Sequence, residues 1–273
     1  MMKTVLAVAF AIICAGCGNN LAGPAGTPVL RPPSALTALS LDSTHVLVGW
    51  TAPADAADTT FRGYIFSWGT TVDTLPRTAV QFTAGPLAPG AVTFSIRSLL
   101  RSGQLSDAAQ ITWAPAWRFD ASAVIVTEYN SALQTGLPGL DAGTATTNPH
   151  AVGFADVNAD STLDFYLYGP GGSSLQLVSA SIYNPGWHQT LFSTVSTPSA
   201  DLNAPLAAFP GDNTFTQTTV TLSDNTIYYV KTTGNAGEIY YVRIHVRLLG
   251  GSYPSRSADI RISLQRVSRL PYA

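Results

Sequence analysis

Two residue types that favour helices are almost missing from this chain. Glu occurs only at positions 128 and 238, and beyond position 3 Lys occurs only at position 231. Glu and Lys are among the better helix formers. Alternating apolar and polar residues recur instead, separated by Gly, Pro, Asn and Asp, and this pattern is typical of strands joined by turns. The sequence therefore predicts an all-β protein.

Charge excludes one class of partner. Charged residues make up 11% of the chain, against about 25% in an average soluble domain. The formal net charge is −2. Nucleic-acid binding calls for a strongly basic face. We therefore expect no nucleic-acid partner.

The first 16 residues have the features of a secretory signal peptide. Lys3 precedes the apolar run 5–13, which is shorter than the roughly 20 residues that span a bilayer. The small residues Ala15 and Gly16 then stand directly before Cys17. This small–small–Cys sequence resembles the lipobox of bacterial lipoproteins, although Cys14 occupies a position where Leu is usual.

The resemblance implies cleavage before Cys17 and a diacylglycerol on its thiol. The membrane would then be a partner of the chain through this lipid anchor. The protein would lie in the bacterial cell envelope, at the outer membrane or the cell surface. An ordinary signal peptide, cleaved elsewhere, is the alternative. Residues 17–33, rich in Gly, Pro, Ala and Asn, predict a flexible tether.

Residues 34–114 contain short alternating strands with turn residues between them, and they predict a β-sandwich. We expect Val46, Val48 and Trp50 to point inward from one strand. Five aromatic or apolar residues of the later strands are also expected inside. They are Tyr64, Phe66, Trp68, Phe94 and Ile96.

This segment resembles a fibronectin type III domain. The resemblance is carried by Pro33, Trp50 with Pro53, Gly63-Tyr64, the 87–90 Leu-Ala-Pro-Gly turn, and Gly103 with Ser106. It implies either an adhesive loop at 101–103, where the sequence is Arg-Ser-Gly, or a spacer between the membrane and the next domain. We favour the spacer.

Residues 117–273 predict a second, larger antiparallel β-sandwich or jelly-roll domain after a short linker at 114–116. Segments 239–249 and 258–268 alternate as a hairpin with one apolar and one polar face. Segments 220–222 and 227–231 suggest a shorter hairpin. No sizeable helix is expected.

The polar face of the longer hairpin is basic. Its cationic residues are Arg243, His245, Arg247 and Arg261. They could bind an acidic polymer, but alternation alone produces such a face, so we expect it to be solvated. Three histidines, at 150, 188 and 245, lack metal-ligand spacing, and a haem or other small-ligand carrier is a remote alternative.

One acidic stretch has the spacing of a calcium loop. Asp156, Asn158, Asp160 and Asp164 stand at relative positions 1, 3, 5 and 9, before an apolar strand at 165–168. The stretch resembles the calcium loop of FG-GAP repeats, though Ser161 replaces the usual glycine and the motif occurs once. The resemblance implies Ca²⁺ as the only cofactor, in a structural role. A polar turn between strands is the alternative.

The usual catalytic signatures are missing from the sequence, including a nucleophile elbow, a His-Glu-x-x-His helix and a Walker loop. We therefore expect no enzyme but a binding or adhesion protein, with a glycan or a surface protein as its ligand. The aromatic residues expected to stack on sugars are Tyr166, Tyr168, Tyr183 and Trp187. A purely structural envelope component and a non-catalytic accessory of a secreted hydrolase are the alternatives.

Overall fold

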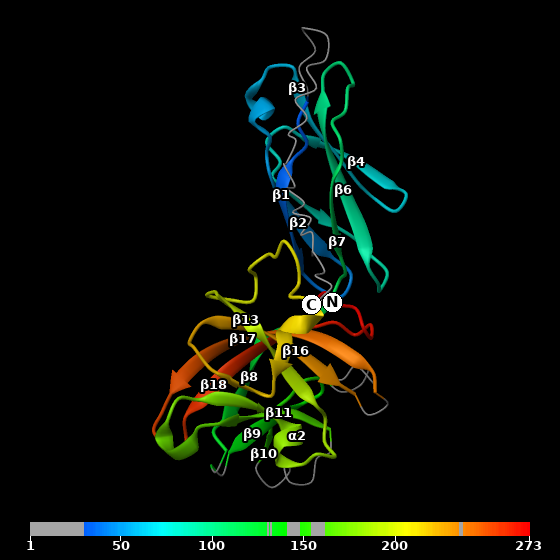
Figure 1. Ribbon diagram of the computed structural model, residues 1–273. Helices are drawn as coiled ribbons and strands as arrows, with labels where there is room; N and C mark the ends of the chain where they lie inside the picture. Colours follow the sequence, from blue (N-terminus) through cyan, green and yellow to red (C-terminus); the bar gives the residue numbers. More distant parts are fainter. Residues whose placement is uncertain (1–29, 130, 132, 141–147, 154–161, 235–236) are drawn as a thin grey trace, which may run out of the picture.

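The computed structural model describes residues 30–129, 131, 133–140, 148–153, 162–234 and 237–273. In this part of the chain the protein is all-β, as expected, with four antiparallel sheets. The sheets form two sandwiches that are stacked end to end (Figure 1). We call them the N-terminal and the C-terminal sandwich.

The N-terminal sandwich pairs a three-stranded sheet, β1-β2-β5, with a four-stranded sheet, β4-β3-β6-β7. Its strands are β1 (Ser34–Ser40), β2 (Val46–Thr51), β3 (Phe61–Trp68), β4 (Thr71–Pro76), β5 (Gln81–Ala84), β6 (Val92–Leu100) and β7 (Ala109–Trp113), and the short helix η1 (Ala54–Ala57) follows β2.

The predicted core of this sandwich is confirmed. The residues expected inside are buried, except that Trp68 is half-buried. Two features were missed. Strand β4 was not predicted, and Leu30, which was expected within the flexible tether, is buried in the core. The backbone of Arg31 is held by Ser98, whose hydroxyl donates to its carbonyl at 2.7 Å. The fixed part of the chain therefore begins before residue 34.

The C-terminal sandwich pairs a five-stranded sheet, β10-β9-β11-β12-β15, with a six-stranded sheet, β14-β13-β16-β17-β18-β8. Its strands are β8 (Trp117–Thr127), β9 (Gln134–Pro138), β10 (Val152–Gly153), β11 (Leu163–Tyr168), β12 (Gln176–Ser179), β13 (Thr190–Pro198), β14 (Phe215–Gln217), β15 (Thr219–Thr221), β16 (Thr226–Thr233), β17 (Ile239–Gly250) and β18 (Ser257–Leu264). The described helices are one turn each: α2 (Ala180–Tyr183), η2 (Pro170–Gly172) and η3 (Asp212–Thr214).

The longer predicted hairpin is confirmed, because β17 and β18 pair with Val246 opposite Ile260. The shorter one is wrong. Strand β15 pairs with β12 in the five-stranded sheet, whereas β16 pairs with β13 and β17 in the six-stranded sheet. Residues 226–230 are buried without alternation, as expected of a central strand that is covered on both faces.

The expectation of a solvated basic face is also wrong. Arg243 and His245 are buried, and only Arg247 and Arg261 remain partly exposed. Residues 199–211, which we call the strap, cross this face between β13 and η3 and lie between the two sandwiches (Figure 1). Arg243 donates to the carbonyl of Ala204 at 2.7 Å, and the His245 ring lies 2.9 Å from the carbonyl of Ser199.

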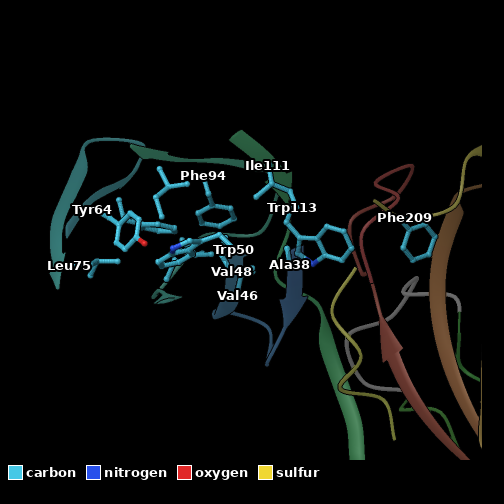
Figure 2. Close-up of a cluster of buried hydrophobic side chains, with 14 of the residues drawn as sticks. Ala38, Val46, Val48, Trp50, Tyr64, Leu75, Phe94, Ile111, Trp113 and Phe209 are labelled. Carbon is cyan, nitrogen blue, oxygen red and sulfur yellow. The ribbon is translucent and has the colours of Figure 1, made fainter. Parts of the chain in front are cut away.

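The core of the N-terminal sandwich is shared with the C-terminal one, because it continues onto the strap and the outer face of the six-stranded sheet. The C-terminal sandwich also has a second core between its own two sheets. Trp113, at the end of β7, is fully buried, and its indole N–H donates to the hydroxyl of Ser40 at 3.0 Å. Its ring lies 5.3 Å from that of Tyr272 in the C-terminal tail. Figure 2 shows Trp113 at the end of the N-terminal core that faces Phe209 of the strap.

A backbone contact reinforces this junction. Ala38 of β1 and Leu206 of the strap exchange two hydrogen bonds, at 2.8 and 2.9 Å. The predicted linker is part of the interface, because Ala114 and Ala116 are fully buried. The N-terminal sandwich is therefore fixed against the C-terminal one.

Replacing Tyr272 tests the junction. Tyr272→Ala removes the ring that packs on Trp113, and we expect it to lower the free energy of unfolding by about 1 to 3 kcal/mol. Thermal or urea unfolding measures this loss. Tyr253→Ala is the control, because Tyr253 is 49% exposed and lies outside the junction. Equal effects of the two substitutions would contradict the shared core.

Candidate functional site

The four aromatic residues expected to bind a ligand lie together, and Tyr129 joins them. Tyr129 is the centre of the group, which we call the aromatic cluster. The ring-centroid distances are 5.5 Å for Tyr129–Tyr166, 6.3 Å for Tyr129–Tyr168, 6.0 Å for Tyr129–Tyr183, 6.3 Å for Tyr166–Tyr168 and 5.6 Å for Tyr183–Trp187.

Strand alternation places two of these rings. In β11, Phe165 and Leu167 point into the core between the sheets, so Tyr166 and Tyr168 lie on the opposite face. Tyr129 follows β8, and its backbone N–H donates to the carbonyl of Leu167 at 2.7 Å. This bond fixes Tyr129 beside the two tyrosines of β11.

A turn places the other two rings. Tyr183 ends the single-turn helix α2. Asn184 then closes a turn, because its carbonyl accepts from the N–H of Trp187 at 2.9 Å and its side chain accepts from Gly186 at 3.0 Å. Trp187 is thereby folded back toward Tyr183.

A buried ion pair supports the base of the cluster. Glu128, directly before Tyr129, is fully buried, and Arg256 donates from Nε to its carboxylate at 2.9 Å. Arg256 also donates to the carbonyl of Ser173. Gly169 lies against this pair, since a Cβ there would come within 2.1 Å of Arg256 and 2.2 Å of Glu128. Any larger residue at 169 would displace the pair.

The rings differ in how much surface they offer. Trp187 and Tyr166 are 8% and 7% exposed, so core packing accounts for them. Tyr183 is 46% exposed, and Tyr129 and Tyr168 are half-buried. Only these last three can present a ring face to a ligand, with the two buried rings as their support.

The phenols of Tyr129 and Tyr166 stay protonated at neutral pH. Burial, a hydrogen bond with Tyr183 and the neighbouring phenols raise the pKa of Tyr129 to about 12. Burial and the phenols of Tyr168 and Tyr183 also raise the pKa of Tyr166. A protonated phenol both donates and accepts hydrogen bonds, as a sugar hydroxyl does.

The acidic stretch is described only at its end. Asp156, Asn158 and Asp160 lie outside the described residues, as does Cys17. Asp164, in β11, is fully buried. Its oxygens accept from the N–H of Leu140 at 2.8 Å and from the hydroxyl of Thr232 at 2.6 Å, and the His188 ring lies at 3.3 Å. Protein donors thus hold this carboxylate between β11 and β16.

The histidines are held by different parts of the fold. His188 contacts Asp164, His245 contacts the strap, and His150 is exposed. The described residues contain no group of three or more His, Cys, Asp or Glu side chains that could hold a metal ion. They also contain no helix that is long and apolar enough to cross a membrane.

Sequence comparison gives no relative of known function. No family model matches the chain, and no curated protein matches it. Among solved structures, it is similar to "Titin kinase and its flanking domains", with 9% sequence identity and a TM-score of 0.25. The match covers 86% of this chain and 38% of that one. A likeness this weak adds nothing to the fold, and the described residues form an all-β protein with several antiparallel sheets.

Replacing Asp164 separates its structural contacts from a calcium site. Asp164→Asn puts an amide where donors from two elements converge, and we expect a loss of about 1 to 3 kcal/mol in the free energy of unfolding. Because the donors belong to the protein, the loss should be equal in calcium and in chelator. Thermal unfolding of both proteins in both buffers measures it, with the exposed Asp107→Asn as control.

The same curves test the predicted calcium loop. If calcium binds, the wild-type protein melts at a higher temperature in calcium than in chelator. If the wild-type unfolding curves in calcium and in chelator superimpose, the alternative of a polar turn at 156–164 is favoured over a calcium site. A loss for Asp164→Asn that appears only in calcium would contradict the structural role of Asp164.

Proposed function

We propose that this chain is a lipid-anchored bacterial envelope protein that binds glycans through its aromatic cluster. In this proposal Cys17 carries the lipid, a fibronectin type III-like sandwich acts as a fixed spacer, and the C-terminal sandwich presents the binding surface. The protein is not an enzyme in this proposal.

The observation that carries the proposal is the position of the aromatic cluster along the molecule. The chain enters the N-terminal sandwich beside η1, where the N–H of Arg31 donates to Asp55 at 3.3 Å. Helix η1 lies near the end of that sandwich away from the junction, whereas α2, which carries Tyr183, lies at the far end of the C-terminal sandwich (Figure 1). An anchor attached before residue 30 would therefore leave the cluster pointing outward.

The chemistry of the cluster suits a sugar. The apolar face of a sugar ring packs on an exposed aromatic face, and Tyr adds a polar group at the edge of the same ring. Tyr183 offers the most exposed ring, beside the phenols of Tyr129 and Tyr168. Ile182, directly before Tyr183 in the chain, is also exposed, at 56%.

The spacer role rests on the junction. A three-stranded and a four-stranded sheet agree with the fibronectin type III resemblance. Because Trp113 and Ala114 are buried against the C-terminal sandwich, the N-terminal sandwich cannot swing on its linker. A fixed spacer keeps the cluster at a constant distance and orientation from its point of attachment.

A glycan array tests the binding role. The chain without its signal peptide carries Cys17→Ser, so that no lipid is attached. It is screened against bacterial and host glycans, and the affinity for each hit is measured by calorimetry. We expect Tyr183→Ala to weaken a hit at least tenfold, because one aromatic contact is worth about 1.4 kcal/mol. Tyr253→Ala is the matched control, since Tyr253 is similarly exposed outside the cluster. Absence of any hit, or equal loss in both variants, would favour a purely structural envelope component.

Radiolabelled or alkyne-tagged fatty acid tests the anchor. We expect label on the wild-type chain expressed with its signal peptide in a Gram-negative host, and the protein in the membrane fraction. Cys17→Ser should abolish both, because the thiol is the attachment point. Label that persists in this variant would place the lipid elsewhere, and an unlabelled, soluble wild-type protein would favour an ordinary signal peptide.

A further inference from the structure

Three polar residues form one row across the six-stranded sheet beneath the strap. Arg243 of β17 is paired with Ser263 of β18, and Ser263 is paired with Arg118 of β8. Neighbouring strands lie about 4.8 Å apart. The residues that flank this row, such as Val242 and Ile262, point into the hydrophobic core on the opposite face. The three polar side chains therefore share the face that the strap covers.

This row is buried. Arg243 has no exposed surface, Ser263 is 1% exposed, and the Arg118 side chain is 7% exposed. Arg243 donates from one guanidinium nitrogen, Nη2, to the strap carbonyls of Leu202 and Ala204. Arg118 donates to the carbonyl of Ser40 at 3.1 Å and to Asn203 at 2.9 Å. The row is thus closed over by the strap and by β1.

Donors in this row outnumber acceptors. Four buried polar atoms in this row have no hydrogen-bond partner among the described residues: Nε of Arg118 and Nε and Nη1 of Arg243, which can only donate, and Oγ of Ser263, which can donate and accept. A buried donor without an acceptor costs about 1 to 3 kcal/mol, and more when it is charged. Four such donors on three adjacent strands point to an acceptor that they share.

The buried positive charge of Arg243 also indicates a bound acceptor. Arg118 pairs with Asp120, whereas Arg243 makes no ion pair with a described carboxylate. Burial lowers the pKa of Arg243 to about 10, so its guanidinium is still protonated at neutral pH. The charge of Arg118 lies near enough to contribute to this lowering. A buried charge without a partner is strongly destabilising, and an anion between the two guanidiniums would offset that cost.

We propose that Arg243, Ser263 and Arg118 bind one small monovalent inorganic anion of the chloride type beneath the strap. A spherical anion accepts from donors that approach from several directions, as these do from three strands. The strap leaves no open approach for a polymer to Arg243, so an acidic glycan or nucleic acid does not fit here. The bound anion links the sheet to the guanidinium that holds the strap, and it thereby strengthens the junction.

Chloride dependence of unfolding tests this site. The full mature chain is melted in sodium gluconate that is replaced stepwise by sodium chloride at constant ionic strength. We expect a saturable rise of a few degrees in the Tm of the wild-type protein. Arg243→Met, which keeps the apolar stem, should lose the rise. Ser263→Ala should weaken the apparent chloride affinity several-fold, because it removes one donor.

Arg269→Met is the matched control, since Arg269 is exposed on the same sandwich and should keep the full chloride effect. If Arg243→Met does not fold, Ser263→Ala carries the test, because it deletes a single oxygen. Crystals grown in sodium bromide should show an anomalous peak between Arg118, Ser263 and Arg243. A Tm that does not respond to chloride, an equal response in wild type and Ser263→Ala, or no bromide peak would overturn the proposal.

Discussion

The burial of one polar sheet face beneath the strap is the constraint on which the rest of the structure depends. Arg243 and His245 hold the strap through its backbone carbonyls. The strap in turn pairs with β1 at Leu206 and brings Phe209 into the shared core. A solvated face would need no cover, and without the cover the N-terminal sandwich would lose its contacts with Leu206 and Phe209. These side-chain-to-backbone hydrogen bonds thus position the strap, which together with the Trp113–Tyr272 contact joins the two sandwiches.

The junction and the aromatic cluster lie at opposite ends of the C-terminal sandwich. Trp113 and Tyr272 meet where the N-terminal sandwich ends, and the C-terminal residue Ala273 is buried at the same place. The aromatic cluster lies at the other end of the C-terminal sandwich, beside α2 (Figure 1). In the proposed function, the elongated shape and the fixed junction hold the binding surface away from the point of attachment.

The aromatic cluster combines rigid support with modest exposure. Its buried members, Tyr166 and Trp187, fix the positions of the rings that solvent can reach. The Glu128–Arg256 pair fixes the residue directly before Tyr129, because Glu128 is held by Arg256 through both its side chain and its backbone N–H. Support of this kind is what a binding surface needs, because a ring that is already ordered loses less entropy when a ligand binds. The same burial also explains why aromatic content alone cannot separate a site from a core.

By itself, the sequence determined the all-β class, the first sandwich apart from β4, the β17–β18 hairpin and four of the five aromatic residues of the candidate site. These depend on local alternation and turn residues, which act over a few positions. Tertiary structure alone decided that β15 and β16 separate into different sheets, that Tyr129 joins the cluster and that the basic face is buried. Tyr129 carries no local signal, because its partners in β11 are distant in the sequence: it has a backbone hydrogen bond to Leu167 and ring contacts with Tyr166 and Tyr168. Arg243 reads as solvent-facing because alternation distinguishes the two faces of a strand, whereas the cover over a face comes from a distant segment, here the strap.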